Sequence, residues 1–549
     1  MRLEDTLPPV PDAAGADPAA AARGWPAGLA GAIRRRLTLE HLLALLLGLL
    51  VLVVHDVPYI LTTSYWNDES WVAITTKFPL SQLRSVVDST PIGWAAVLRV
   101  INMPGTQSGR LMPLAFAGVA VVIAYWFARQ LGWRQRESAV AAGVLAAVAA
   151  LLVPSMLVRN DLKQYTADAC LSLLVLALTA RLEREWSRPR LAALSVAVWG
   201  GMLFSDAVAF IGVGAFAAVC LVQLARRAWR RLGESVAVGA ITAILMLVVY
   251  KAFYAAAVNA GLVYSPHFRY YYLPLRQGLH ASITFITGAF TAVHNIFGLG
   301  PVWLGLPLFL AGVVTVLWLD RPATAITLAA LYPEMMAISA VHKYPFLDLR
   351  TSTFLFVVTA VTAAIGVVGV CAALQPLLKE WTPVLVIAIS VLAIAGFTVN
   401  NASYIRMHSI PAEDERAQTL YVADHARPND VILVNLSSNW GFAYYWAHGQ
   451  AARRTDPYVA QGYEAYFPDQ PRIVVAFNRT NSAVAAALSQ AVAQSRQRSC
   501  SPIWLIRTHV SAGEYAAWSA ALRQEGLTAK YAGVHELRII QVRGSSQCR

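Results

Sequence analysis

The stretch SGRLMPLAFAGVAVVIAYWFAR (residues 108–129) decides the fold class of this chain. No charged side chain interrupts it between Arg110 and Arg129. A helix of roughly 17 to 25 apolar residues is long enough to cross a bilayer. This stretch therefore predicts a transmembrane helix.

Similar apolar runs recur along most of the chain and are separated by short polar loops. Of the 549 residues, 57% are hydrophobic and only 14% are charged, which is too apolar for a water-soluble protein of this length. We therefore predict an all-α polytopic membrane domain over residues 37–400, with about eleven transmembrane helices. The predicted spans are residues 38–57, 110–128, 138–154, 164–180, 190–204, 207–225, 235–256, 300–318, 323–341, 350–373 and 383–399.

Arginine clusters in alternate loops predict the orientation of this domain, because such clusters mark the cytoplasmic side of a membrane. The Ala-, Pro- and Gly-rich segment 1–36 ends in one of them and predicts a disordered cytoplasmic tail. An odd number of spans then places the chain after about residue 400 outside. We expect a multi-pass protein of the plasma membrane. The clusters are Arg34, Arg35 and Arg36; Arg129, Arg134 and Arg136; Arg181, Arg184, Arg188 and Arg190; and Arg226, Arg227, Arg230 and Arg231.

The carboxyl-terminal region, residues 401–549, predicts an extracytoplasmic α/β domain. Apolar runs bounded by turn residues alternate there with helical patterns, which is typical of this class. In an oxidising compartment Cys500 and Cys548 could form a disulfide, or they could remain two free thiols. The predicted strands are 431–436, 472–477 and 502–509, and the predicted helices are 482–494 and 513–526.

The formal net charge of +13 raises the question of a nucleic-acid partner. The basic residues cluster between the spans, however, and they form neither a basic domain nor a pattern interleaved with aromatic residues. The cytoplasmic bias of Lys and Arg accounts for most of the charge. We therefore expect membrane lipids, and no nucleic acid, among the partners.

The outer stretch SYWNDESW (residues 64–71) carries two adjacent carboxylates, Asp68 and Glu69. They could be an ordinary solvated pair. The flanking tryptophans favour a position at the level of the lipid headgroups, where partial shielding raises the proton affinity of a carboxylate and suits it to act as a general base. The pair is a candidate catalytic site.

Basic side chains on the predicted outer side run against the cytoplasmic bias. They occur in RNDLKQYTADA (159–169) and in VHKYPFLDLR (341–350). Helix-end charges and snorkelling side chains are the plain explanation, but a bound anion would also give outer cations a purpose. The candidate residues are Arg159, Lys163, Lys343 and Arg350, with Asp161 beside them and Arg110 at the start of the second span.

A further outer stretch, HFRYYYLPLR (267–276), combines arginines with tyrosines. It could be an aromatic belt at the membrane surface. Equally, Arg269, Tyr271 and Arg276 could belong to a mobile flap, because aromatic faces stack on sugar rings and arginines bind phosphate.

Together these features resemble the GT-C class of integral-membrane glycosyltransferases. The resemblance is to the branch of protein O-mannosyltransferases and lipid A aminoarabinose transferases, the family 39-like enzymes. It covers about residues 40–400 and rests on four features. They are the acidic pair in a long first outer loop (58–109), the entry to the second span (108–129), RNDLKQYTADA (159–169) and KYPFLDLR (343–350).

The resemblance implies a hexosyl or pentosyl transferase with a polyprenyl-phosphate sugar donor. The acceptor would be a cell-envelope glycan, lipid or protein on the outer face. Asp68 would be the catalytic base of a single inverting displacement, and the outer cations would stabilise the charge that develops on the departing phosphate. Glu69 and Asp161 would orient the base or hold a divalent cation, which some members of the class need. A sequon-binding motif is lacking, which disfavours transfer to asparagine.

The main alternative is a polytopic transporter or lipid flippase. Transporters tend to show internal repeats and ionisable residues at mid-membrane. We find no repeat, and Asp206 fits a short outer turn. A third reading makes the membrane part an anchor for an outer binding domain, but an anchor needs neither many spans nor outer cations.

Overall fold

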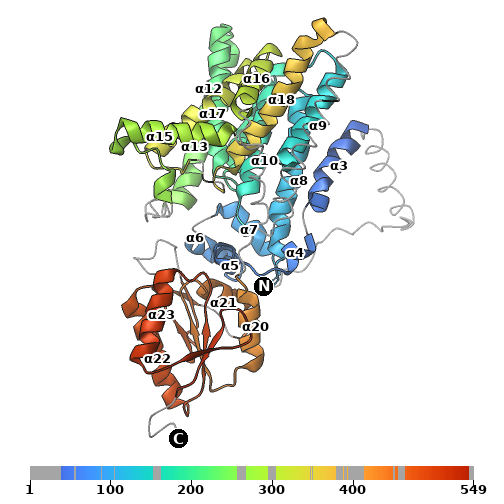
Figure 1. The fold of residues 1–549 in the computed structure, drawn as a ribbon. Helices are drawn as coiled ribbons and strands as arrows, with labels where there is room; N and C mark the ends of the chain where they lie inside the picture. The colour runs from blue at the N-terminus through green and yellow to red at the C-terminus, as the bar shows by residue number, and fades with distance from the viewer. Residues whose placement is uncertain are drawn as a thin grey trace, which may run out of the picture.

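The protein consists of a helical bundle and a smaller α/β domain, which lies below the bundle in Figure 1. The first outer loop lies between the two parts. The computed structural model describes residues 39–54, 57–87, 90–103, 106–152, 162–255, 268–294, 304–346, 348, 350–378, 388, 392, 413–448, 452–454 and 464–542.

Every predicted span before residue 379 coincides with a helix. The last one, 383–399, lies outside the described residues. Six of the described helices are long and apolar enough to cross a membrane, so the count of eleven and the side of each loop stay predictions. The helices are α3 (Leu39–Val54), α8 (Leu111–Arg129), α9 (Arg136–Leu152), α10 (Tyr165–Arg184), α11 (Arg188–Gly201), α12 (Ala207–Ala225), α13 (Trp229–Val249), α16 (Gly305–Trp318), α17 (Pro322–Ala340) and α18 (Thr353–Leu378).

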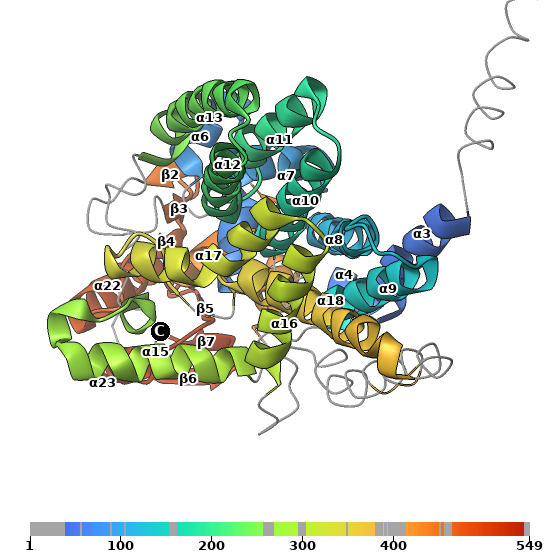
Figure 2. The same cartoon turned by 90° about the horizontal axis from the view of Figure 1, so that it is seen from above.

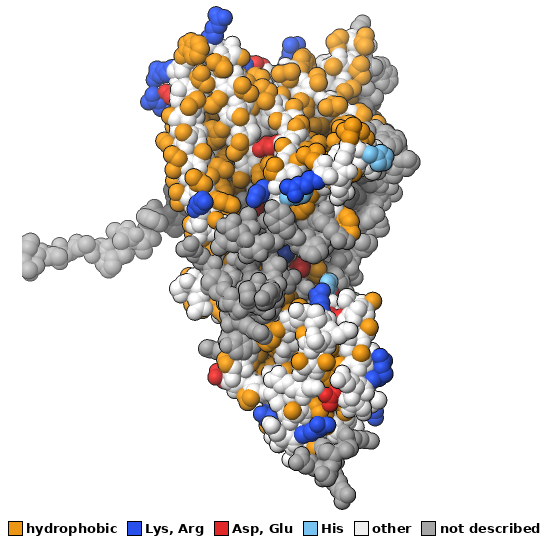
Figure 3. Space-filling model, turned by 90° about the vertical axis from the view of Figure 1, so that its left-hand side faces the viewer, with side chains coloured by type: hydrophobic (Ala, Val, Ile, Leu, Met, Phe, Trp, Pro, Cys, Tyr) orange, Lys and Arg blue, Asp and Glu red, His pale blue; other side chains and the backbone are white. Residues whose placement is uncertain are grey.

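Hydrophobic side chains cover the bundle on the face shown in Figure 3, whereas the domain below it has a mixed, more polar surface. Small residues bring the helices close together, as is usual in membranes. At the contact of α16 with α18, a Cβ on Gly312 would come within 1.9 Å of the Thr362 carbonyl oxygen. The bundle therefore has a lipid-facing exterior and a tightly packed interior.

One helix of the bundle region was not predicted. Helix α15 (Leu279–His294) lies within the segment that we interpreted as an outer loop. Figures 1 and 2 both show it running across the other helices at the edge of the bundle. It therefore lies across the predicted transmembrane helices instead of running parallel to them.

The first outer loop is made of four short helices: α4 (Val57–Thr62), α5 (Asn67–Thr75), α6 (Leu83–Val86) and α7 (Ile92–Ile101). Helix α7 is amphipathic, with one apolar face. Trp94 and Leu98 on that face are fully buried, so α7 packs into the protein between the bundle and the lower domain.

The α/β domain has a five-stranded sheet of order β4-β1-β5-β7-β6. The first three strands are parallel and fall on the three predicted strands, whereas β7 and β6 are antiparallel and were not predicted. A separate hairpin joins β2 (Ala452–Arg454) to β3 (Glu464–Tyr466). The sheet strands are β1 (Val431–Val434), β4 (Ile473–Val475), β5 (Ile503–Ile506), β6 (Ala529–Tyr531) and β7 (Arg538–Ile540).

The two faces of the sheet belong to different cores, because alternate residues of a strand point to opposite sides. Val431 and Leu433 pack against the predicted helices, α22 (Asn481–Gln497) and α23 (Ala512–Gln524). Ile432 faces the other way.

That second face is covered by α20 (Glu415–His425) and α21 (Asn439–Tyr445). Its core continues without a break into the first outer loop. Trp71 of α5 and Trp440 of α21 lie in this one cluster, with ring centroids 6.0 Å apart. The α/β domain and the outer loop therefore share a hydrophobic core.

Candidate active site

The acidic pair of the outer loop lies in the first turn of α5, which begins at Asn67. Acidic side chains are favourable there because the amino-terminal end of a helix carries a partial positive charge. Consecutive residues of a helix point in different directions. The two carboxylates accordingly have different surroundings: the side chain of Asp68 is 23% exposed, whereas that of Glu69 is fully buried.

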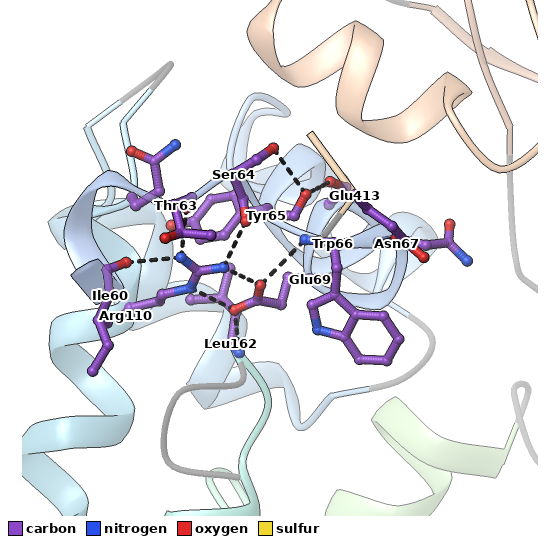
Figure 4. A network of polar contacts seen from close by, with 12 residues as sticks. Ile60, Thr63, Ser64, Tyr65, Trp66, Asn67, Glu69, Arg110, Leu162 and Glu413 are labelled. Atoms are coloured by element: carbon purple, nitrogen blue, oxygen red, sulfur yellow. Dashed lines mark hydrogen bonds and ion pairs between the residues drawn. The ribbon is translucent and has the colours of Figure 1, made fainter. Parts of the chain in front are cut away.

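Glu69 forms a buried ion pair with Arg110, and neither side chain is exposed to solvent. Figure 4 shows the two groups facing each other. Arg110 Nε lies 2.7 Å from Glu69 Oε1, and Nη2 donates to Oε2. The carboxylate also accepts hydrogen bonds from the backbone N–H groups of Trp66 (3.3 Å) and Leu162 (3.1 Å). A buried ion pair is tolerated only when its polar atoms are satisfied in this way.

Arg110 uses all of its N–H groups in this network. Its two Nη atoms also donate to the carbonyl oxygens of Ile60 (2.7 Å), Thr63 (2.6 Å) and Ser64 (2.9 Å). Nε can donate once and each Nη twice, so no donor is left. The phosphate-binding role that we predicted for Arg110 does not fit this arrangement.

Glu69 is therefore a structural residue, and a catalytic role does not fit it. Through Leu162 it fixes the position of the adjacent residue, Lys163. Among the described residues, no group of three or more His, Cys, Asp or Glu side chains is placed to hold a metal ion. With Glu69 paired to Arg110, the described residues do not offer a donor set for the divalent cation that we considered, and no step is assigned to one.

Asp68 lies between two cations. Its Oδ2 accepts a hydrogen bond from Arg350 Nη1 at 2.6 Å, and Lys163 Nζ lies 3.7 Å from the same oxygen. Burial on its own would raise the pKa of Asp68, but Lys163, Arg350 and His509 together hold that pKa below its ordinary value. Asp68 is therefore ionised at neutral pH, and the raised proton affinity that we expected for it is not found.

The two flanking tryptophans hold these cations in place. Arg350 lies over the ring of Trp66 at 5.2 Å from its centroid, and Lys163 lies over the ring of Trp71 at 5.4 Å. Such cation–π contacts stabilise a charge that has lost part of its water. Trp71 is buried rather than exposed to headgroups, which corrects the position that we inferred for it.

Arg350 is positioned by the turn that precedes α18. Asp348 Oδ2 accepts hydrogen bonds from the backbone N–H of Thr351 (2.9 Å) and from its hydroxyl (3.2 Å). Tyr344 closes the same turn by donating from its hydroxyl to the Thr351 carbonyl oxygen at 2.9 Å. The turn at Tyr344 and Pro345, the Tyr-Pro turn, thus directs Arg350 toward Asp68.

The other predicted residues are placed differently. Lys343 is exposed and is not among the groups that interact with Asp68. The Tyr271 carbonyl oxygen accepts a hydrogen bond from the Phe346 N–H at 2.7 Å, so this stretch is tied to the Tyr-Pro turn. Arg276 is exposed on a neighbouring short helix. Arg159, Asp161 and the side chain of Arg269 lie outside the described part of the chain.

The structure answers only in part whether the two cysteines of the α/β domain form a disulfide with each other. Cys500 is disulfide-bonded, and Cys548 lies outside the described residues. The pairing of the two therefore remains a prediction. Among the described residues, Cys170, Cys220 and Cys371 are free thiols.

The α/β domain contributes residues that the sequence did not reveal. Four hydrogen bonds connect it to α5 and the residues just before it. Their partners are separated by more than 340 positions in the chain, so no local pattern could have indicated them. They are Tyr65 N–H to Tyr445 Oη (2.9 Å), Asn67 N–H to Glu413 Oε2 (2.9 Å), Arg416 N–H to Ser64 Oγ (3.0 Å) and Ser70 Oγ to Glu415 Oε2 (3.2 Å).

Comparison with known proteins identifies the fold. No family model matches the chain, and no curated protein matches its sequence. Among solved structures, the Archaeoglobus fulgidus oligosaccharyltransferase, in complex with Zn and sulfate, has a TM-score of 0.53 at 12% identity. That match covers 91% of this chain and 72% of the other. ArnT from Cupriavidus metallidurans, bound to undecaprenyl phosphate, has a TM-score of 0.47 at 14% identity, over 93% of this chain and 98% of that one.

The likeness to the oligosaccharyltransferase extends over the bundle, the outer loop and the α/β domain together, since it covers nine-tenths of this chain. At this identity it is a likeness of fold. The chain therefore has the fold of the GT-C membrane glycosyltransferases, as the resemblance of its sequence predicts.

Proposed function

We propose that this protein transfers a sugar from a polyprenyl-phosphate donor to an acceptor hydroxyl, with Asp68 as the general base. The observation that carries the proposal is the charge around Asp68. One ionised carboxylate is shared by Lys163 and Arg350, which leaves a surplus of positive charge at a partly exposed site. Such a site can bind a phosphate group next to a carboxylate that accepts a proton.

The cations have a role in the transition state. As the bond between the sugar and the phosphate breaks, negative charge develops on the phosphate oxygens, and preorganised cations lower the barrier. Lys163 and Arg350 are held over tryptophan rings, so they lose little freedom when a phosphate binds. These two residues are our assignment for donor phosphate binding.

The same cations control the base. While both interact with Asp68, its pKa is low and it is a weak proton acceptor. A bound phosphate would share the two cations, so the proton affinity of Asp68 would rise toward its ordinary value. Asp68 would then accept the acceptor hydroxyl proton as the oxygen attacks the anomeric carbon, with inversion in one displacement. Donor binding thus activates the base.

The fold supports this proposal, since the solved structure with which it is shared is an oligosaccharyltransferase. The placement of the site on the outer face of the plasma membrane follows from the arginine clusters of the loops. The acceptor, a cell-envelope glycan, lipid or protein, would approach from the side of the α/β domain.

The test is the variant Asp68→Asn, which keeps the shape of the side chain. Purified protein in liposomes is supplied with a native membrane lipid extract, and transfer is followed by mass spectrometry of the sugar-carrying lipid and its products. We expect transfer to fall by about 10²-fold or more with an unchanged unfolding temperature. Asp424→Asn, an exposed aspartate of α20, is the matched control. Full transfer by Asp68→Asn would exclude Asp68 as the base.

A further inference from the structure

His509 of the α/β domain lies at the edge of the candidate site. It follows β5 in the chain, and its Nδ1 lies 2.6 Å from Glu413 Oε1. The other carboxylate oxygen of Glu413 accepts the backbone N–H of Asn67 at 2.9 Å. A continuous chain of polar contacts therefore runs from His509 to the residue that immediately precedes Asp68.

The backbone at His509 is held in an unfavourable conformation. Its φ is +50°, in the left-handed region that residues other than glycine seldom adopt. Strain of this kind persists only where the surrounding structure enforces it, and it clusters at functional sites. This backbone conformation places the imidazole next to Glu413.

The charges around His509 favour its protonated form. Glu413 raises the pKa of His509 through their hydrogen bond and their charge interaction, although burial and Arg479 oppose the shift, and Asp68 adds to it. Arg479 itself is directed to Glu514 (3.6 Å) and donates to Ser437 Oγ (2.5 Å). His509 in turn lowers the pKa of Asp68, which connects the α/β domain to this carboxylate.

We propose that His509, held by Glu413, is a positioning residue of the transfer site that holds the helical turn of Asp68 in place. Lys163 and Arg350 reach Asp68 from the membrane domain, whereas His509 acts on it from the α/β domain. Both parts of the protein therefore act on Asp68, and the α/β domain is part of the proposed catalytic site. This inference rests on the proposed function.

The sign of the effect follows from the charges. Ionised Asp68 is the active form, so activity falls as pH decreases through its lowered pKa, and loss of the His509 cation moves this acid limb to higher pH. At the alkaline end, the imidazolium is lost as pH rises through its raised pKa, and the contact with Glu413 weakens. We expect activity to decline there, by about an order of magnitude, because the turn that carries Asp68 loosens.

The experiment compares pH profiles of kcat/KM for wild-type protein, His509→Gln and His509→Lys, with transfer measured in liposomes as above. In His509→Gln we expect the acid limb at higher pH, because one of the groups that lower the pKa of Asp68 is lost, and no alkaline limb from an imidazole. His509→Lys keeps the cation, so its acid limb should stay near that of wild-type and its alkaline limb should move to higher pH. His535→Gln, an exposed histidine of the same domain, is the control.

Two results would overturn the inference. One is a wild-type pH profile in both His509 variants. The other is an equal loss at every pH together with a lower unfolding temperature, which would indicate a structural role alone. If His509→Gln folds poorly, Glu413→Gln provides a second test. Loss of the Glu413 carboxylate should lower the pKa of His509 and so move the alkaline limb to lower pH. The outcome is separable from the proposed function, because transfer that survives Asp68→Asn would refute the base whatever the histidine variants show.

Discussion

At the scale of single residues, the two neighbouring carboxylates of the site have different surroundings and different roles. Glu69 is enclosed with Arg110, and Asp68 lies between cations at a partly exposed edge. The sequence indicated the pair and singled out Asp68 as the base, but it also assigned Arg110 to phosphate binding. The structure instead places Arg110 in a buried network, and the difference has a physical source. An arginine that opens a span looks the same in sequence whether it binds a ligand or fills a buried network.

The buried pair predicts an asymmetric response to substitution. Arg110→Ala would leave the Glu69 carboxylate buried without its partner, which typically costs about 3 to 5 kcal/mol. Arg110→Met combined with Glu69→Met removes both charges and should cost less than the single change. Thermal unfolding in detergent measures both variants. Equal destabilisation by the single and the double change would contradict the role of the pair.

The cations of Asp68 predict a shift in donor affinity. Arg350→Gln should raise KM for the donor about tenfold or more, because charge-assisted contacts to phosphate are strong. It should also move the acid limb of the pH profile upward, since one of the groups that lower the pKa of Asp68 is lost. Lys343→Gln, at the exposed basic residue of the same loop, is the matched control. An unchanged KM in Arg350→Gln would remove this residue from the donor site.

At the scale of elements, α5 is the part on which the site depends. Its residues hydrogen-bond to Glu413, to Glu415 of α20 and to Arg110 at the start of α8, and Trp71 packs on Trp440 of α21. The helices and parallel strands with strong periodicity were predictable from sequence. Helix α15, strands β6 and β7, and the packing of α5 on α21 were not, because each depends on partners far away in the chain.

Glu415 at the start of α20 predicts a stability that depends on pH. It is fully buried between α5 and α21, and burial raises its pKa well above the ordinary value. A group with a raised pKa in the folded state favours folding at low pH, and this contribution is lost as pH rises through that pKa. Glu415→Gln removes the ionisation, so it should raise the unfolding temperature more at pH 8.5 than at pH 5.

Differential scanning fluorimetry at several pH values measures the effect of Glu415→Gln. Glu525→Gln, at a half-buried glutamate after α23, provides the baseline. A gain for Glu415→Gln that is the same at every pH would mean that the pKa of Glu415 does not differ between the folded and the unfolded protein.

At the scale of the whole molecule, the bundle and the α/β domain are connected through one shared core. The composition and the arginine clusters were enough to predict a membrane bundle followed by an α/β domain. They could not predict the contact between the two parts, because the residues of α5 and α21 that meet there show no common pattern in the sequence. Packing between distant segments decides it.

The shared core predicts cooperative behaviour. Hydrogen–deuterium exchange should show α5 and α21 opening together, since Trp71 and Trp440 belong to one cluster. Trp71→Ala creates a cavity at this contact, with an expected cost of about 3 to 5 kcal/mol, and should accelerate exchange in both helices. Trp518→Ala, in the separate core beneath α22 and α23, should leave exchange in α5 unchanged. Acceleration confined to α5 would show that the two parts open independently.

The shared core also defines what can be exchanged between proteins of this architecture. A chimera that replaces only the carboxyl-terminal domain would cut through the contact of Trp71 with Trp440 and would strip α5 of its partners. The transplantable module is the domain together with residues 64–103. Because that module includes the turn of Asp68, the proposed base, a graft that is meant to carry a new acceptor preference must bring this residue with it.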